Sequence, residues 1–286
     1  MPETPLAAAV RRPRTLAEAF KIMKSGDLPR FYLAGGTDLI VKARDGMAPP
    51  SIWCDLTGLP ELRGVRLRGG RIEIGSGTVY MDLIQASLIL RHAPALVDAM
   101  REIGGEQIKN RGTLGGNLAN ASPAADSVPA LFSLGAMVHT RLGAGKRDIS
   151  VEKFATGPGR TVLKPGELIV AVSFPARKAI RGKFLRLGQR QANAISKISV
   201  AASLTLTNGR VDWAGVALGA VGPTVIRARH TEQVLIGQPL TVRTIDAAVN
   251  AVMVEARPID DVRSTAAYRR RMCGVLLKRI LTSLGS

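Results

Sequence analysis

Cysteine, histidine and aromatic residues are scarce in this chain. It has 2 cysteines and 3 histidines among 286 residues, and aromatic residues make up 4%. Cys54 and Cys273 belong to no Cys-x-x-Cys pair, and His92, His139 and His230 have no metal-ligand spacing. The chain therefore lacks the patterns that hold an iron–sulfur cluster or a four-ligand zinc ion, and we expect no metal site.

The motifs of common hydrolases and nucleotide-binding proteins are missing too. There is no Gly-x-Ser-x-Gly, no Gly-x-x-x-x-Gly-Lys-Ser/Thr and no Gly-x-Gly-x-x-Gly that opens a helix. We therefore expect no catalytic residue in this chain. If it is part of an enzyme, its chemistry belongs to an organic cofactor.

Long hydrophobic runs are also absent. No uncharged stretch reaches the ~18 residues of a membrane-spanning helix. The weak apolar run at 6–10 precedes Arg11 and Arg12, which reverses the order of a secretory signal. We therefore expect a cytoplasmic protein with no transmembrane segment.

Acidic residues are few compared with basic ones. The chain has 40 Lys and Arg against 22 Asp and Glu, which gives a net charge of +18. The basic residues are spread along the sequence, and only Arg269-Arg270-Arg271 forms a tight cluster. Such a charge suits solubility, an acidic protein partner or nucleic acid. Because aromatic platforms for stacked bases are rare, we favour an acidic protein partner and expect no nucleic acid.

The order of elements predicts an α+β fold. Gly69-Gly70 and Asn208-Gly209 each separate two strand-like segments, which predicts two hairpins. The segment 175–182 is basic and marked by Pro and Gly, and we place a domain boundary there. We predict strands at 30–34, 65–68, 71–74, 168–174, 198–207 and 211–220, and helices at 39–43, 81–90, 127–134, 245–257 and 265–284, with a further helix that begins at the capping box Thr15-Leu16-Ala17-Glu18.

Two glycine-rich segments, which we call the first bend (34–39) and the second bend (112–126), carry the functional prediction. Glycine permits a positive φ and close approach of a ligand to the backbone, and successive amides form an anion-binding nest. Thr37, Thr113, Asn117, Asn120 and Ser122 add neutral hydrogen-bonding groups. This combination suits a pyrophosphate attached to a polyhydroxylated chain, although glycine pairs are also common in simple turns.

These segments resemble the FAD-binding (medium) subunit of the molybdenum hydroxylases, which include carbon monoxide dehydrogenase and xanthine dehydrogenase. The resemblance covers nearly the whole chain. It is carried by four segments in order: Ala34-Gly35-Gly36-Thr37-Asp38-Leu39, Thr113 to Asp126, Phe154 to Pro175 and Phe184 to Ala201. It implies a p-cresol methylhydroxylase-type FAD-binding fold of two subdomains, at 1–58 and 59–178, plus a C-terminal α+β domain at 179–286.

The resemblance also implies which residues bind FAD. Gly35, Gly36 and Thr37 are expected to donate amides to the pyrophosphate. Thr113 and Leu114 to Asn117 are expected to cradle the same pyrophosphate, so the two bends should meet in space. Ser122 and Asp126 match positions near the ribityl and adenosine parts. Asp126 could instead cap the helix at 127–134, and Ile103, which stands where xanthine enzymes carry an aromatic residue, could be plain core. The full expected set is Leu33, Ala34, Gly35, Gly36, Thr37, Asp38, Leu39, Ile103, Thr113, Leu114, Gly115, Gly116, Asn117, Ser122, Asp126, Leu168, Ile169 and Arg186.

Arg186 stands where the family has a Lys or Arg close to the flavin. A cation there would stabilise the reduced, anionic flavin, whereas an ordinary solvent-exposed arginine is the alternative. Leu168 and Ile169 match a family contact with the flavin ring.

The family assembles with an iron–sulfur small subunit that carries [2Fe–2S] clusters and a molybdopterin large subunit, as a dimer of heterotrimers. The resemblance thus implies an oxidoreductase subunit that passes electrons from the clusters through FAD to an external acceptor. Two alternatives stay open: a stand-alone flavin reductase of the same fold superfamily, and a basic nucleic-acid-binding protein.

Overall fold

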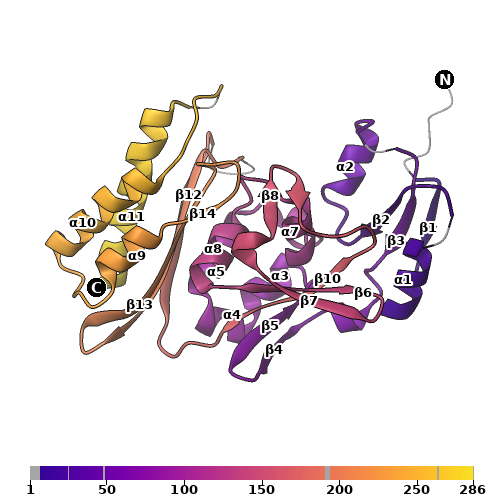
Figure 1. Ribbon diagram of the computed structural model, residues 1–286, viewed down its shortest axis with the longest axis horizontal. Coiled ribbons are helices and arrows are strands. Elements are labelled where there is room, and N and C mark those ends of the chain that lie inside the picture. Colours follow the sequence, from indigo (N-terminus) through magenta and orange to yellow (C-terminus); the bar gives the residue numbers. More distant parts are fainter. Residues whose placement is uncertain (1–6, 25, 48, 191–193, 263, 286) are drawn as a thin grey trace.

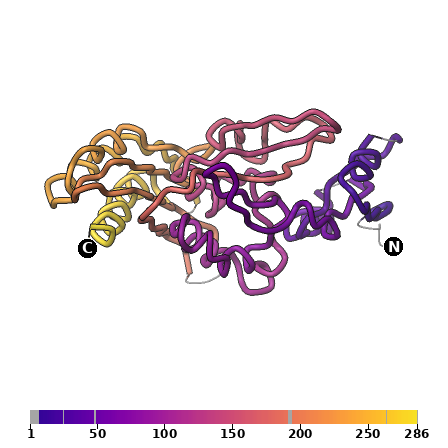
Figure 2. The backbone as a smooth tube through the Cα atoms, turned by 90° about the horizontal axis from the view of Figure 1, so that it is seen from below, coloured from indigo at the N-terminus to yellow at the C-terminus, as the bar shows by residue number. Residues whose placement is uncertain are grey.

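The computed structural model describes residues 7–24, 26–47, 49–190, 194–262 and 264–285. The molecule is elongated, with the N-terminal elements at one end and the C-terminal helices at the other (Figure 1, Figure 2). Strands form a three-, a five- and a four-stranded sheet and one two-stranded ribbon. Beyond the N-terminal sheet, runs of strands and runs of helices follow one another along the chain, which confirms the predicted α+β class.

The N-terminal sheet is parallel. Its order is β1 (Ala9–Arg11), β3 (Ile52–Asp55) and β2 (Arg30–Leu33), with α1 (Leu16–Lys24) between β1 and β2 and α2 (Leu39–Arg44) between β2 and β3. The first bend connects β2 to α2 and thus lies at the carboxyl end of a parallel strand. In open parallel sheets, this edge is where ligands bind.

The central sheet is antiparallel. Its order is β4 (Val65–Arg68), β5 (Arg71–Gly75), β10 (Leu168–Pro175), β6 (Met137–Leu142) and β7 (Gly145–Ser150), and the predicted hairpin around Gly69-Gly70 forms. The other elements of this region are η1 (Pro60–Leu62), α3 (Tyr80–Gln85), α4 (Ser87–His92), α5 (Pro94–Glu102), α6 (Glu106–Lys109), α7 (Leu114–Asn120), α8 (Ser127–Leu134), η2 (Val151–Lys153), β8 (Ala155–Gly157) and β9 (Arg160–Thr161).

The single helix predicted at 81–90 is wrong, because α3 and α4 are separate helices. Ala86 between them is extended, with φ −67° and ψ 120°. Tyr80 and Ile89 are both buried, at 2% and 0% exposure. At 3.6 residues per turn, positions nine apart point to opposite sides of one straight helix. The break at Ala86 lets both side chains reach the same core.

The C-terminal sheet has the order β11 (Arg181–Leu187), β12 (Ile198–Thr207), β13 (Arg210–Gly219) and β14 (Ile226–Arg227). The predicted hairpin at Asn208-Gly209 is confirmed, and both residues have positive φ, 52° and 75°. This region ends with α9 (Arg229–Leu235), α10 (Val242–Glu255) and α11 (Ala266–Gly285). Within the described ranges, none of the helices combines the length and hydrophobicity that crossing a membrane requires.

The C-terminal sheet is covered on both faces. Val200 and Leu204 of β12 pack into the core formed with α9, α10 and α11, whereas Ala201 packs into the central core. Small residues let α8 come close to the sheet: a Cβ on Gly215 of β13 would lie 1.9 Å from the carbonyl oxygen of Ser133. This contact fixes the C-terminal region against the helix that follows the second bend.

Candidate functional site

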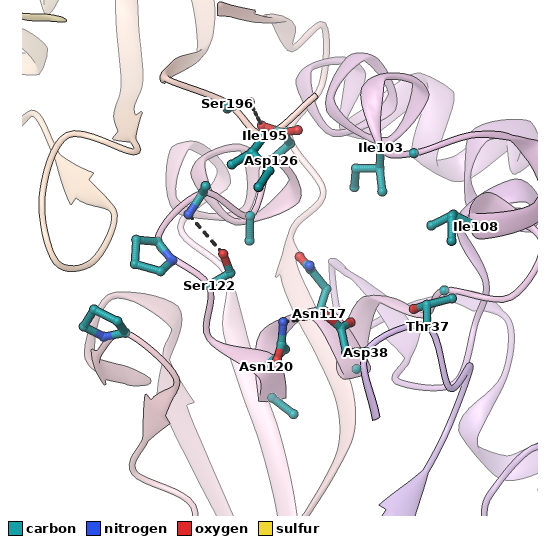
Figure 3. Close-up of a pocket in the computed structure, with 18 of the residues that line it drawn as sticks. Thr37, Asp38, Ile103, Ile108, Asn117, Asn120, Ser122, Asp126, Ile195 and Ser196 are labelled. Atoms are coloured by element: carbon teal, nitrogen blue, oxygen red, sulfur yellow. Dashed lines mark hydrogen bonds between the residues drawn. The ribbon is translucent and has the colours of Figure 1, made fainter. Parts of the chain in front are cut away.

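A cavity of about 1320 Å³ lies where the three regions of the chain meet. Figure 3 shows Thr37 and Asp38 on one side, Asn117, Asn120 and Ser122 on another, and Ile195 and Ser196 at the C-terminal side. Ligand pockets usually measure about 300–1,000 Å³. This cavity therefore has room for a large, elongated ligand.

The two glycine bends meet at this cavity. A Cβ on Gly35 would lie 1.9 Å from the carbonyl oxygen of Arg111 and 3.1 Å from the Cα of Gly112. The two backbones are thus in direct contact, and no side chain larger than hydrogen fits between them. Gly36 has φ +78°, which completes the tight turn. The sequence prediction that these distant segments lie together is confirmed.

The two bends differ in their free amides. In the described part of the chain, the amides of Gly35, Gly36 and Thr37 donate to no protein acceptor. In the second bend, by contrast, the amides of residues 114–117 already donate to protein acceptors, so their binding to a phosphate stays a prediction. The amide of Leu114 donates to Thr78 O (3.4 Å), Gly115 to Ser76 O (2.9 Å), Gly116 to Thr113 Oγ1 (3.1 Å) and Asn117 to Thr113 O (3.0 Å).

Most residues predicted to bind the cofactor line the cavity. They come from the first bend, the second bend, the end of α5 and strand β11. Those that line it are Ala34, Gly35, Gly36, Thr37, Asp38, Leu39, Ile103, Thr113, Gly116, Asn117, Ser122, Asp126 and Arg186.

Leu33, Leu114, Gly115, Leu168 and Ile169 do not line the cavity. Leu114 and Ile169 are in the central core, and Leu168 is in the core of the N-terminal region. A Cβ on Gly115 would lie 2.6 Å from Ser76 Cβ, so this glycine packs on the chain itself. A direct contact with the cofactor remains a prediction for these five residues.

Asp126 and Arg186 form a buried ion pair at the C-terminal side of the cavity. Arg186 Nη1 lies 3.0 Å from Asp126 Oδ2, and each side chain is 7% exposed. The second carboxylate oxygen accepts a hydrogen bond from Ser196 Oγ at 2.6 Å. The Asp126 side chain makes no capping hydrogen bond to α8, so the capping alternative is wrong. The alternative of a solvent-exposed Arg186 is wrong as well.

Further contacts hold Arg186 in place. Its Nε lies 3.0 Å from Glu102 Oε2, and Nη1 donates to the carbonyl of Ala194 at 2.8 Å. Burial raises the pKa of Asp126 to about 6, although the hydrogen bond from Ser196 and the charge of Arg186 oppose the shift. The loss of solvation is therefore larger than the attraction of the cation.

Several residues of the cavity were not predicted. Ser196, Ile195 and the segment 220–223 come from the C-terminal region, and Lys42 lies on α2. The residues of the C-terminal region reach the cavity only because the C-terminal sheet packs against α8. No local pattern in the sequence indicates such a long-range contact. Ile103 lines the cavity and also packs, partly buried, against the central core. The residue therefore agrees both with a place beside the cofactor and with a place in the core.

Comparison with known proteins identifies the family. Residues 6–177 match the family described as "FAD binding domain in molybdopterin dehydrogenase", and residues 183–284 match the "CO dehydrogenase flavoprotein C-terminal domain". The chain belongs to the FAD-binding subunits of the molybdenum hydroxylases.

Its relatives in this family match over nearly their full length. The chain is 32% identical over 278 residues to the xanthine dehydrogenase FAD-binding subunit of Escherichia coli O157:H7, covering 96% of this chain and 95% of that one. It is 30% identical over 273 residues to the carbon monoxide dehydrogenase medium chain of Hydrogenophaga pseudoflava, covering 95% and 94%.

A solved carbon monoxide dehydrogenase from Hydrogenophaga pseudoflava, which lacks the Mo-pyranopterin moiety of the molybdenum cofactor, matches with a TM-score of 0.92. The identity is 28%, with 98% of each chain covered. This FAD-binding subunit is thus an oxidoreductase component with FAD as its cofactor. The amides of Gly35, Gly36 and Thr37, which have no protein acceptor in the described part of the chain and belong to residues of the cavity wall, fit a diphosphate.

Proposed function

We propose that this FAD-binding subunit takes electrons from [2Fe–2S] clusters on a partner subunit and passes them through FAD to an external acceptor. Two facts support this role. The relatives are named as subunits or medium chains of dehydrogenases. Residues 6–177 also match the family described as "FAD binding domain in molybdopterin dehydrogenase".

The residues of the cavity have separate tasks. The amides of Gly35, Gly36 and Thr37 would hold the diphosphate, and Ser122 and Asp126 would lie near the sugar-alcohol part. Ile103 and Ile195 would offer apolar contacts to the ring. Bound FAD supplies the ability to take up and release electrons. Arg186 would place a guanidinium group in the wall of the cavity, where a cation favours a reduced, anionic ring, although the carboxylates of Asp126 and Glu102 balance part of its charge.

We further propose the partners and the arrangement of the chain. The partners are an iron–sulfur small subunit and a molybdopterin large subunit, joined as a dimer of heterotrimers in the cytoplasm. Within the chain, 1–58 and 59–178 are the two subdomains around FAD, and 179–286 closes the cavity from the third side.

One observation carries the proposal: the Gly35 and Arg111 backbones touch at the wall of a cavity that all three regions line. The test is to purify the chain with its partners and measure flavin, iron and molybdenum. In stopped flow without oxygen, electrons placed on the iron–sulfur clusters should bleach the visible flavin absorbance.

The same experiment separates the alternatives. A chain that purifies alone with FAD, and whose flavin is reduced directly by a nicotinamide, would be a stand-alone flavin reductase. A colourless chain that binds DNA in a salt-dependent manner would be a nucleic-acid-binding protein. Either result would contradict the proposed role.

A further inference from the structure

A short chain of hydrogen bonds crosses the cavity from the first bend to the end of α7. Asn120 Nδ2 donates to Asp38 Oδ1 at 2.8 Å, across a sequence separation of 82 residues. Lys42 Nζ donates to Asn120 Oδ1 at 2.6 Å. All three residues line the cavity, and Figure 3 shows Asp38 and Asn120 beside each other. The amide of Asn120 thus joins a carboxylate and an ammonium group that both belong to the N-terminal region.

Asp38 occupies a position where an aspartate usually caps a helix. It immediately precedes α2, and an aspartate there normally caps the helix by accepting a backbone amide. Its side chain makes no capping hydrogen bond. Instead its carboxylate is directed across the cavity to Asn120. The side chain therefore serves the contact between the two regions and not the local helix.

We propose that Asp38, Asn120 and Lys42 form a clasp that retains FAD by closing the N-terminal region against α7. The inference rests on the proposed FAD site. The clasp is in the wall of the same cavity as the free amides of Gly35 to Thr37, so it joins the N-terminal region to α7 beside the place where the diphosphate would bind.

Charge gives the clasp a second role. A carboxylate next to the first bend would repel a diphosphate. Asn120 directs a donor to this carboxylate, and Lys42 adds a positive charge to the same network. A hydrogen bond to a charged group contributes more than one between neutral groups. Without Asn120, the negative charge of Asp38 would face the diphosphate without a partner from α7.

The rate of FAD release from the full-length holoprotein tests the clasp. Release can be followed in excess apoprotein of another flavoprotein, which captures the freed FAD and becomes active with it. We expect Asn120→Ala to release FAD about three- to tenfold faster than the wild type, as the loss of such hydrogen bonds predicts. Lys42→Met should change the rate in the same direction. The control Asn250→Ala, at an exposed asparagine on α10 outside the cavity, should release FAD at the wild-type rate.

A double-mutant cycle shows whether the residues act together. In an Asp38→Ala background, Asn120→Ala should have a smaller further effect, because one of the two partners of Asn120 is already gone and only Lys42 remains. The thermal midpoints of the FAD-free variants should match that of the wild type, which a general loss of stability would not allow. An unchanged release rate for Asn120→Ala, or the same increase in both backgrounds, would overturn the clasp. A wild-type chain that binds no FAD would overturn the proposed function itself.

Discussion

Among the glycines that line the cavity, Gly35 has the least space for a side chain. Its Cα faces the Arg111 carbonyl, and a Cβ would lie 1.9 Å from that oxygen. Backbone atoms on the other side cannot rotate away as a side chain can. Any substitution therefore has to push the two bends apart.

We predict that Gly35→Ala abolishes retention of FAD. The added methyl group separates the bends and displaces the amides that hold the diphosphate. The flavin-to-protein ratio after purification measures the effect, which should be at least tenfold. Gly58→Ala is the matched control, because a Cβ there meets nothing within 4 Å. Full flavin content in the Gly35 variant would show that the bends do not form the site.

Asp126 gives a prediction about pH. Its pKa is raised from 3.8 to about 6 in the folded chain. Such a group stabilises the fold when protonated, and this contribution is lost as the pH rises through about 6. The expected loss is about 3 kcal/mol, since each unit corresponds to about 1.4 kcal/mol.

Asp126→Asn should remove this pH dependence. Urea unfolding of the FAD-free protein between about pH 4 and pH 7 measures it. Relative to the variant, the wild type should lose free energy of unfolding as the pH rises. Parallel pH profiles for the two proteins would show that Asp126 titrates normally.

At the scale of elements, the tightest contact is between α8 and β13. Gly215 faces the Ser133 carbonyl, and Gly219 faces the ring of Pro129, where a Cβ would lie 2.8 Å from Cγ. The Ser133 and Ser203 hydroxyls also share a hydrogen bond of 2.9 Å. These small residues position the C-terminal region over the cavity.

We predict that Gly215→Ala destabilises the protein by about 1–3 kcal/mol or more, because overpacking forces backbone shifts. Thermal unfolding of the FAD-free protein measures the change. Gly58→Ala again serves as the control and should unfold at nearly the wild-type temperature. If the Gly215 variant were equally stable, α8 and the sheet would not be in close contact.

Local patterns were sufficient to predict many of the elements. Both hairpins follow from the dipeptides Gly69-Gly70 and Asn208-Gly209, which favour left-handed turns. The capping box was partly right: the Glu18 amide donates to Thr15 Oγ1 at 3.2 Å, but the Glu18 carboxylate accepts from the Arg14 amide at 2.7 Å. The break at Ala86 was not predictable, because it depends on which side chains the core accepts.

Only those parts of the candidate site that lie within one continuous segment could be predicted. The glycines of the first bend and the polar residues of the second bend are visible in the sequence because each bend is continuous. The hydrogen-bond partners of Asp126 could not be predicted from a local pattern, because Ser196 and Arg186 lie 70 and 60 residues away in the sequence. The sequence also contained no sign that amides in the second bend donate to protein acceptors, because those acceptors, such as Ser76 O, belong to another segment.

At the scale of the whole molecule, the charge of +18 predicts how the chain finds its partners. A strongly positive surface attracts acidic subunits over a distance set by the screening length of the salt solution. This length falls from about 30 Å at an ionic strength of 0.01 M to about 8 Å at 0.15 M. The association rate with the partner subunits should therefore fall steeply over this range, as stopped-flow fluorescence can measure. A rate independent of salt would show that the net charge does not guide assembly.

The three regions of the molecule meet at a single cavity, and the account rests on FAD lying there. A crystal structure of the chain grown with FAD tests this most directly. We predict that the diphosphate lies within hydrogen-bonding distance of the Gly35, Gly36 and Thr37 amides, with the sugar-alcohol part near Ser122. FAD bound elsewhere, or a diphosphate that makes no contact with the first bend, would contradict the account.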